Sequence, residues 1–395
     1  MDYGMSPELE RFRLEVRAFV EANAPKIAPK AGVRTAENRA EHTLITEWIG
    51  KLFAAGYMGG GWPQRYGGQG SAYSAERDVV VGEEIARARA PHFAGAGGLV
   101  SHALIDFGTE EQRQRYLPGI RSGKDTWCQL FSEPSSGSDL ASLRTKAVRN
   151  EGGGFLVSGQ KVWTTNGQWA EYGYLLARTD PDAPKHKGIS ALIVDMTLPG
   201  VDVRPLREMT GTSDFNEVFL DNVELPADAL IGELHAGWVI ANSSLAHERT
   251  SVATSVVLLR QNVDALADLA RRVDRGGRPA IEDGAVQETL GKLDAEVAAL
   301  SALVYANISR WSRGTERVQD APMAKLMFSE LGVQISRFAL ELSGEAGILV
   351  EGDIGAVDHG RWQDEFLYAR GYTIAGGSSE IMRNIIAERG LKMPR

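Results

Sequence analysis

The stretch GFLVSGQKVWTTN, residues 154–166, decides which fold the chain is expected to adopt. It carries β-branched and aromatic residues in short runs, which is typical of strands. Similar runs, separated by turn residues, follow as YGYLLART, ISALIVDM, VDVRPL and NEVFLDNVEL. The region from 126 to 234 is therefore predicted to be a small β domain, a barrel or a sandwich.

The sequence on the N-terminal side of this region has a helical period. Ser6 and Pro7 form a cap signal, since proline is favoured in the first turn of a helix. The apolar residues that follow share one face of a helix: Leu9, Phe12, Val16, Phe19 and Val20. Residues 1–125 are expected to form a helical N-terminal domain.

The helical period returns after the β-rich region. A set of apolar residues recurs at alternating spacings of four and three, as in a helix packed in a bundle: Val286, Leu290, Leu293, Val297, Leu300 and Val304. Residues 274–284 have the composition of an exposed loop between two long helices. The predicted fold class is α+β, with a helical bundle over residues 235–395.

Composition excludes several classes of protein. At 395 residues the chain exceeds one typical domain, and its net charge of −9 argues against binding to nucleic acid. Cys128 is the only cysteine, which excludes an internal disulfide, and the histidines show no metal-binding spacing, so no metal site is expected. No apolar run approaches the roughly 18 residues that span a bilayer, and with its acidic first residues the protein is expected to be cytoplasmic.

A polar turn is predicted after the apolar start of residues 129–139, QLFSEPSSGSD. Hydroxyl groups and backbone N–H groups in such a turn form a concave donor surface that suits a phosphate or the edge of a polar ring. An ordinary surface turn would have the same composition. The pattern leaves both interpretations open.

A second candidate is residues 161–167, KVWTTNG, at the end of a predicted strand. Trp163 is suited to cover the face of a planar cofactor, while Thr165 donates to its edge. The alternative is that Trp163 belongs to the core of the β domain.

Glu248 is predicted to be a carboxylate on an apolar helix face. It shares one stripe with its neighbours at helical spacing: Leu245, Val252, Val256 and Leu259. Burial would raise the pKa of such a carboxyl and make it a better proton acceptor at neutral pH. The alternative is a partly exposed glutamate that pairs with a basic neighbour such as Arg249.

Two glycines precede a predicted helix start in residues 372–384, YTIAGGSSEIMRN. Gly377 is explained by the turn into the helix, which needs a permissive residue. The local sequence gives no reason for Gly376.

These segments together resemble the flavin-dependent acyl-CoA dehydrogenase family over nearly the whole chain. FSEPSSGSD (131–139) is similar to the flavin loop of that family, KVWTTNG (161–167) to its K-x-W-I/T-T-N segment and GGSSEIMRNIIAER (376–389) to its closing helix. GWPQRYGGQG (61–70) and YLPGIRSGK (116–124) are similar to parts of its helical N-terminal domain. The resemblance implies a C-terminal four-helix bundle.

The resemblance also implies FAD, bound by the β domain and the C-terminal helices. Ser132 would face the flavin pyrimidine, Ser138 would also reach the thioester, and Thr165 would lie near N5. The residues that it assigns to FAD are Gln129, Leu130, Phe131, Ser132, Gly137, Ser138, Trp163, Thr164, Thr165, Ser378, Ser379 and Glu380. Those that it assigns to the substrate are Ser138, Arg249, Gly376 and Gly377.

The implied reaction is α,β-dehydrogenation of an acyl-CoA thioester, as in fatty acid β-oxidation, with electrons passed to an electron-transfer flavoprotein. Many members of the family have a glutamate base where this chain has Gly376. The isovaleryl-like and long-chain-like branches instead place it where this chain has Glu248, which is predicted to be the base. Gly376 would then keep its N–H for the thioester carbonyl and leave room for a bulky acyl group.

Two segments depart from the family pattern. The R-x-x-F-G run that crosses a subunit interface is replaced by residues 270–284, ARRVDRGGRPAIEDG, and the Q-x-F-G-G-x-G run is reduced to residues 341–347, ELSGEAG. The chain is therefore expected to form either a homotetramer or a heterotetramer with a related chain. A non-catalytic subunit that completes the FAD site of another chain is the alternative function.

Overall fold

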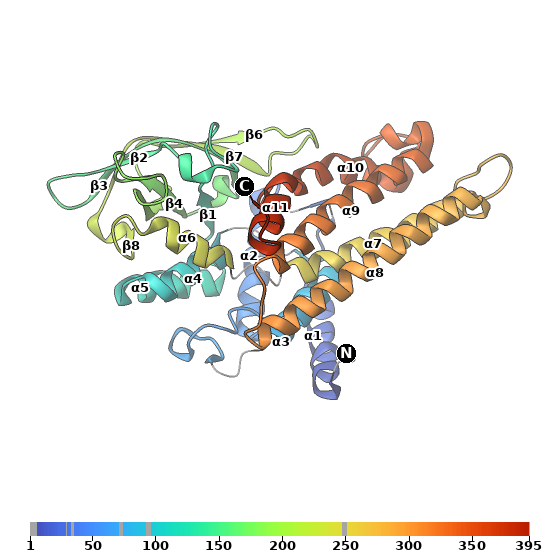
Figure 1. The fold of residues 1–395 in the computed structure, drawn as a ribbon, viewed down its shortest axis with the longest axis horizontal. Helices are drawn as coiled ribbons and strands as arrows, with labels where there is room; N and C mark the ends of the chain where they lie inside the picture. The colour runs from blue at the N-terminus through green and yellow to red at the C-terminus, as the bar shows by residue number, and fades with distance from the viewer. Residues whose placement is uncertain are drawn as a thin grey trace.

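The chain folds as helices, then a sheet, then a second set of helices (Figure 1). The computed structural model describes residues 6–28, 30–32, 35–70, 74–91, 96–246 and 251–394. Among these residues, no helix has the length and apolar character needed to cross a membrane.

The N-terminal helices begin at the capping residues that the sequence offers. Ser6 accepts a hydrogen bond from the Leu9 N–H at 3.2 Å, and Thr109 and Gln112 form a reciprocal capping box. Val16 and Val20 are fully buried, which confirms the predicted apolar face. The helices are α1 (Pro7–Asn23), α2 (Arg39–Ala54), α3 (Ala75–Arg87), α4 (Gly97–Phe107) and α5 (Glu110–Ser122).

Eight strands form one sheet in the middle of the chain, in the order β6-β7-β3-β2-β4-β5-β8, with β1 parallel to β4. They are β1 (Trp127–Leu130), β2 (Lys146–Arg149), β3 (Phe155–Thr165), β4 (Tyr172–Arg178), β5 (Ile189–Asp195), β6 (Val201–Leu206), β7 (Phe215–Leu225) and β8 (Leu230–Ile231). Within the described residues β6 and β8 do not pair with each other, so the sheet is not a closed barrel. The short strand β2 joins the two halves of the sheet and meets β4 at a single position, Lys146 opposite Arg178.

The C-terminal region is a bundle of long helices, α7 (Ser251–Arg272), α8 (Gly284–Ser312), α9 (Asp320–Ser343) and α10 (Arg361–Tyr372) (Figure 1). The predicted seam of α8, from Val286 to Val304, is buried at every position. The shorter helices α6 (Gly237–Ala246) and α11 (Ser379–Asn384) flank the bundle in the sequence. A largely exposed loop, residues 273–283, joins α7 to α8, as the composition predicted, and its Gly276 and Gly277 both have positive φ.

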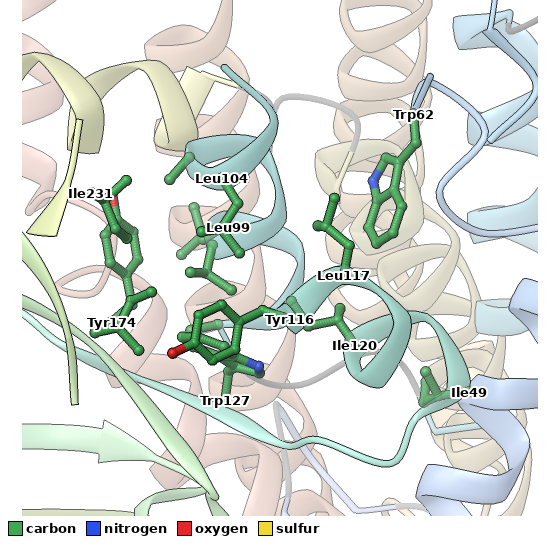
Figure 2. Packing of buried hydrophobic residues seen from close by; sticks show 14 of the residues in the cluster. Ile49, Trp62, Leu99, Leu104, Tyr116, Leu117, Ile120, Trp127, Tyr174 and Ile231 are labelled. Carbon is green, nitrogen blue, oxygen red and sulfur yellow. The ribbon is translucent and has the colours of Figure 1, made fainter. Parts of the chain in front are cut away.

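One hydrophobic core joins the N-terminal helices to the sheet (Figure 2). Leu104 of α4 and Leu117 of α5 belong to the same buried cluster as Trp127 and Tyr174 of the sheet. Because α4 and α5 pack on the sheet, the first residues of β1 are held in a fixed position. The loop that follows β1 starts from that position.

Candidate active site

The loop of residues 131–139, which we call the flavin loop after the family that it resembles, leaves the core at the end of β1. Leu130 and Phe131 are buried, and Phe131 packs edge-on against Tyr174 with ring centroids 5.0 Å apart. Glu133 and Ser136 close a turn through two backbone hydrogen bonds of 3.0 Å. The loop backbone is thus fixed at its base.

The far end of the flavin loop is exposed. Gly137 and Ser138 are exposed to solvent, and a side chain added at Gly137 would meet no atom within 4 Å. Ser136 is instead buried and its hydroxyl donates to the Asp139 carbonyl at 2.9 Å. There is open space beside Gly137, and the Ser138 side chain is exposed next to it. This space suits a polar ligand that bonds to the Ser138 hydroxyl.

The second predicted segment, residues 163–165, lies at an irregularity in β3. The pairing of β3 with β7 shifts register between Lys161 and Thr164, and Trp163 between them has φ of +60°. This bulge turns the Trp163 side chain out of the sheet, so that 60% of it is exposed. Its ring packs edge-on against Phe215, with ring centroids 5.9 Å apart. Trp163 is therefore not a core residue, which removes the alternative interpretation of the sequence.

The two threonines after Trp163 have different surroundings. Thr164 is fully buried, and its Oγ1 has no hydrogen-bond partner among the described residues. Thr165 is half-buried and directly follows. A role of Thr164 at a cofactor would have to pass through its backbone, because its side chain does not reach the surface.

The structure brings these two segments together. The Val162 N–H, directly before Trp163, donates to the Ser132 carbonyl at 2.9 Å. The flavin loop and the β3 bulge therefore lie side by side, although about 30 residues separate them in the sequence.

The third predicted segment, residues 376–380, enters the short helix α11. Gly376 and Gly377 have φ of +66° and +99°. The backbone thus gives a local reason for Gly376 as well as for Gly377, which sequence reasoning did not find, because only glycine adopts this region freely. A side chain at Gly376 would meet no atom within 4 Å, whereas one at Gly377 would come within 2.4 Å of Met382 Cε.

Polar contacts fix the start of α11. The Lys325 ammonium donates to the Gly377 carbonyl at 2.6 Å, and Ser378 caps the helix by accepting the Ile381 N–H at 3.4 Å. Ser379 is buried with its hydroxyl 2.8 Å from Glu330, while Glu380 is exposed. Among the residues predicted here to contact FAD, Ser378 and Glu380 remain accessible to a ligand, and Gly376, predicted to contact the substrate, is exposed.

Glu248 and Arg249 lie outside the described residues, between α6 and α7. The apolar stripe that was predicted to contain Glu248 is only partly present, because Leu245 is 40% exposed while Val256 and Leu259 are buried. The described parts of α6 and α7 lie on either side of these residues in the sequence. The assignment of Glu248 therefore rests on the family position.

Sequence reasoning missed a buried ion pair beneath the flavin loop. The Lys161 ammonium is fully buried, 2.9 Å from Glu133, and burial lowers the pKa of Lys161 to about 8. Hydrogen bonds and the Lys161 charge hold the pKa of Glu133 below its usual value despite its burial. A lysine within an apolar strand and a glutamate within the flavin loop were the available signals.

The residues present fit a flavin at the sheet side of the site. Trp163 offers an exposed aromatic face, Thr165 and Ser132 are half-buried hydroxyls, and Gly137 leaves open space. A planar, polar-edged ring system needs an apolar face together with donors along its edge. Among the residues described on either side of the gaps, no cluster of three His, Cys, Asp or Glu is placed to hold a metal ion.

Three family models match the chain in order: the N-terminal domain of acyl-CoA dehydrogenases over residues 6–124, the middle domain over 128–223 and the C-terminal domain over 235–391. The chain belongs to the acyl-CoA dehydrogenase family. It is an oxidoreductase that acts on CH–CH groups, and FAD is its cofactor. The expected fold and family are confirmed.

The relatives include several mycobacterial enzymes. The chain is 35% identical to acyl-CoA dehydrogenase IpdE1 of Mycobacterium tuberculosis over 395 residues, with 98% of each chain covered. It is 40% identical to acyl-CoA dehydrogenase FadE34 of the same organism over 350 residues, which are 87% of this chain and 46% of FadE34. The chain thus spans about half the length of FadE34.

Solved structures that cover the whole chain include two that are more than 30% identical to it. A structure described as the Tcur3481-Tcur3483 steroid ACAD has a TM-score of 0.88 at 31% identity, with 100% of each chain covered. The ChsE4-ChsE5 complex of Mycobacterium tuberculosis has a TM-score of 0.85 at 32% identity, again over 100% of each chain. The relatives thus include members that are described as complexes of two named chains.

Proposed function

We propose that the chain converts an acyl-CoA thioester into the 2-enoyl-CoA, with the flavin loop and the β3 bulge forming the sheet side of the site. The observation that carries this proposal is the hydrogen bond of 2.9 Å from Val162 to Ser132, which places the two segments side by side. FAD, when bound, supplies the acceptor for the hydrogen that leaves the β carbon.

The residues that would hold FAD come from the two sides of the site. Trp163 would cover one face of the ring system, and the hydroxyls of Ser132 and Thr165 would donate to its edge. Backbone N–H groups around Gly137 and the exposed Ser138 would contact the remainder of the cofactor. Ser378 and Glu380, at the start of α11, would contact its far end.

Glu248 would act as the base that takes the α proton of the thioester. Hydrogen bonds from Ser138 and from the Gly376 backbone N–H to the thioester carbonyl would stabilise the negative charge that develops there. Removal of the α proton from a thioester needs both elements, because the carbanion is stable only while its charge rests on the carbonyl oxygen.

The acyl group is proposed to be bulky. Gly376 carries no side chain, and a substituent there would meet no other atom within 4 Å, so the turn leaves space for a large substrate. A relative of 31% identity over the whole chain is described as a steroid ACAD. We propose a steroid-derived or branched thioester in preference to a short linear one, with electrons passed to an electron-transfer flavoprotein.

Assembly with a second, related chain is the accompanying proposal. The ChsE4-ChsE5 complex contains a relative at 32% identity, and the family's R-x-x-F-G run is absent from residues 270–284. Native mass measurement with flavin counting tests this proposal. A homotetramer with four FAD would contradict it, whereas a chain that binds FAD fully only with a partner would support it.

The reaction itself is tested by anaerobic mixing of the yellow protein, alone or with its partner chain, with a panel of acyl-CoA thioesters. Bleaching of the flavin absorbance and formation of the enoyl-CoA are the expected result, fastest with branched or steroid-derived acyl groups. A flavin that stays oxidised with every thioester would contradict the proposed reaction.

A further inference from the structure

The buried pair of Lys161 and Glu133 connects the segments that build the sheet side of the proposed site. The Lys161 ammonium donates to Glu133 Oε1 at 2.9 Å and to two carbonyl oxygens, those of Phe131 at 3.0 Å and Leu176 at 2.8 Å. An ammonium group has three protons to donate, so each is used. Lys161 therefore ties strand β3 to the flavin loop and to strand β4 at one point.

Glu133 extends the network into the next segment. Its carboxylate accepts the N–H groups of Arg144 at 2.7 Å and Thr145 at 2.8 Å, and its backbone closes the turn with Ser136. The flavin loop is thus fixed at both of its ends, by Phe131 and Glu133 before Gly137 and by residues 144 and 145 after it. Glu133 has 6% of its side chain exposed and Lys161 none.

Lys161 lies at the position in β3 where the pairing with β7 changes. Lys161 is the last residue of β3 that keeps its register with β7 before the bulge that turns Trp163 outward. An anchor at Lys161 therefore determines where the bulge begins, while its bond to Phe131 determines where the flavin loop begins. Both segments proposed to contact the flavin start within two residues of the same buried pair.

Stability alone does not explain such a pair. Removing two charges from water costs free energy that their attraction only partly recovers, and well-packed apolar residues of similar size often stabilise a fold as well or better. A buried pair with every donor used does fix one arrangement of the segments around it, because any shift leaves a buried charge without a partner.

We propose that Lys161 and Glu133 are positioning residues that set the flavin loop and Trp163 in register with each other, and thereby set how FAD is held. The inference rests on the proposed role of these two segments as the flavin site. It assigns to the pair no contact with substrate or cofactor.

The test compares Lys161→Met/Glu133→Gln, which removes both charges, with the wild-type protein. We expect the double variant to fold, since no unpaired charge remains. Its flavin should be held in a changed position: weaker FAD retention, an altered visible circular dichroism of the flavin and anaerobic reduction slower by up to about 10²-fold, which is the cost of a misplacement near 1 Å. The matched control is Arg310→Met/Asp320→Asn, which removes a largely buried pair of the helical bundle (2.8 Å) and should leave the flavin signals unchanged.

A double variant with wild-type FAD retention, flavin circular dichroism and reduction rate would overturn the proposal and make the pair purely structural. If the double variant does not fold, Glu133→Gln alone decides, because the glutamine amide oxygen still accepts from the Lys161 ammonium, which keeps its bonds to Phe131 and Leu176; wild-type flavin signals in that variant would equally overturn the proposal. FAD retention and circular dichroism need no substrate, so they report on the pair even if no thioester reduces the wild-type flavin.

Discussion

The flavin loop and the glycine turn at residues 376–378 are proposed to meet the same ligands, but the structure holds them differently. The flavin loop is held by Lys161, which is fully buried and donates to three acceptors. The glycine turn is held by Lys325, which is half-buried. A side chain at Gly376 would enter open space, whereas Phe131, the first residue of the flavin loop, lies in the hydrophobic core.

The difference follows from what each side has to do. A cofactor that stays bound needs a surface with fixed geometry, and buried polar networks provide one. A substrate that enters and leaves needs space, which two glycines provide because they add no side chain. The comparison predicts that substitutions in the flavin loop or the β3 bulge alter FAD binding. Substitutions at Gly376 are predicted to alter the range of substrates.

The largest expected effect belongs to neither segment but to the proposed base, Glu248. Glu248→Gln should retain FAD and bind acyl-CoA, yet reduce its flavin about 10²–10⁴-fold more slowly, because the amide cannot accept the α proton. Stopped-flow absorbance under anaerobic conditions measures this rate. Adding Gly376→Glu to a Glu248→Gly background should recover part of the activity with short, unbranched acyl groups; a reduction rate near wild type in Glu248→Gln would identify Glu248 as structural.

The two glycines give a matched pair of variants. Gly377→Ala should lower the free energy of unfolding by about 1–3 kcal/mol, because its positive φ is strained and its new Cβ displaces the terminal methyl of the buried, flexible Met382 side chain. Gly376→Ala should cost only about 1 kcal/mol, since its strain is conformational and its new Cβ meets no atom. Urea unfolding of both variants tests the order, and equal costs would show that contact with Met382 is unimportant.

Trp163→Ala should change cofactor binding more than it changes the fold. The side chain is 60% exposed in the chain, so its loss removes little buried area, whereas loss of an aromatic face should weaken FAD binding about tenfold. Fluorescence titration of the apoprotein with FAD measures the dissociation constant. An unchanged constant would place the flavin away from the β3 bulge.

The smallest effect is expected at Thr164. Its buried hydroxyl has no partner within the part of the chain that the structure describes, so Thr164→Val should leave the free energy of unfolding unchanged or raise it by about 1 kcal/mol, and FAD binding should be unaffected. Thermal unfolding and FAD titration provide both readouts. A loss of stability above about 1 kcal/mol would mean that the hydroxyl has a partner.

Features of the fold that depend on neighbouring residues could be predicted from the sequence. Features that depend on contacts between distant segments could not. The strand period of residues 154–166 and the apolar seam of residues 286–304 are local patterns, and both elements formed as predicted. The open sheet was not predicted, because whether the end strands β6 and β8 pair depends on the arrangement of the whole sheet. The same reason hid the buried pair of Lys161 and Glu133, whose residues gain their meaning only when the segments meet.

The predicted site residues likewise differ in how much the sequence alone could show. A motif predicted that the flavin loop and Trp163 act together, and the structure places them side by side, yet it could not predict that Leu130 and Phe131 would turn into the core. The exposure of Leu245 likewise depends on how α6 packs, which periodicity does not reveal. Backbone angles, as at Gly376, are a further feature that composition alone leaves undetermined.

Isotope substitution tests the proposed reaction most directly. The purified protein, with its partner chain if FAD binding requires one, is mixed anaerobically with the best thioester of the panel, deuterated at the α carbon, at the β carbon or at both. If Glu248 takes the α proton while the β hydrogen leaves for the flavin, each substitution slows flavin bleaching and one enoyl-CoA forms per flavin reduced. Bleaching without an isotope effect at the β carbon, or without enoyl-CoA, would contradict the account.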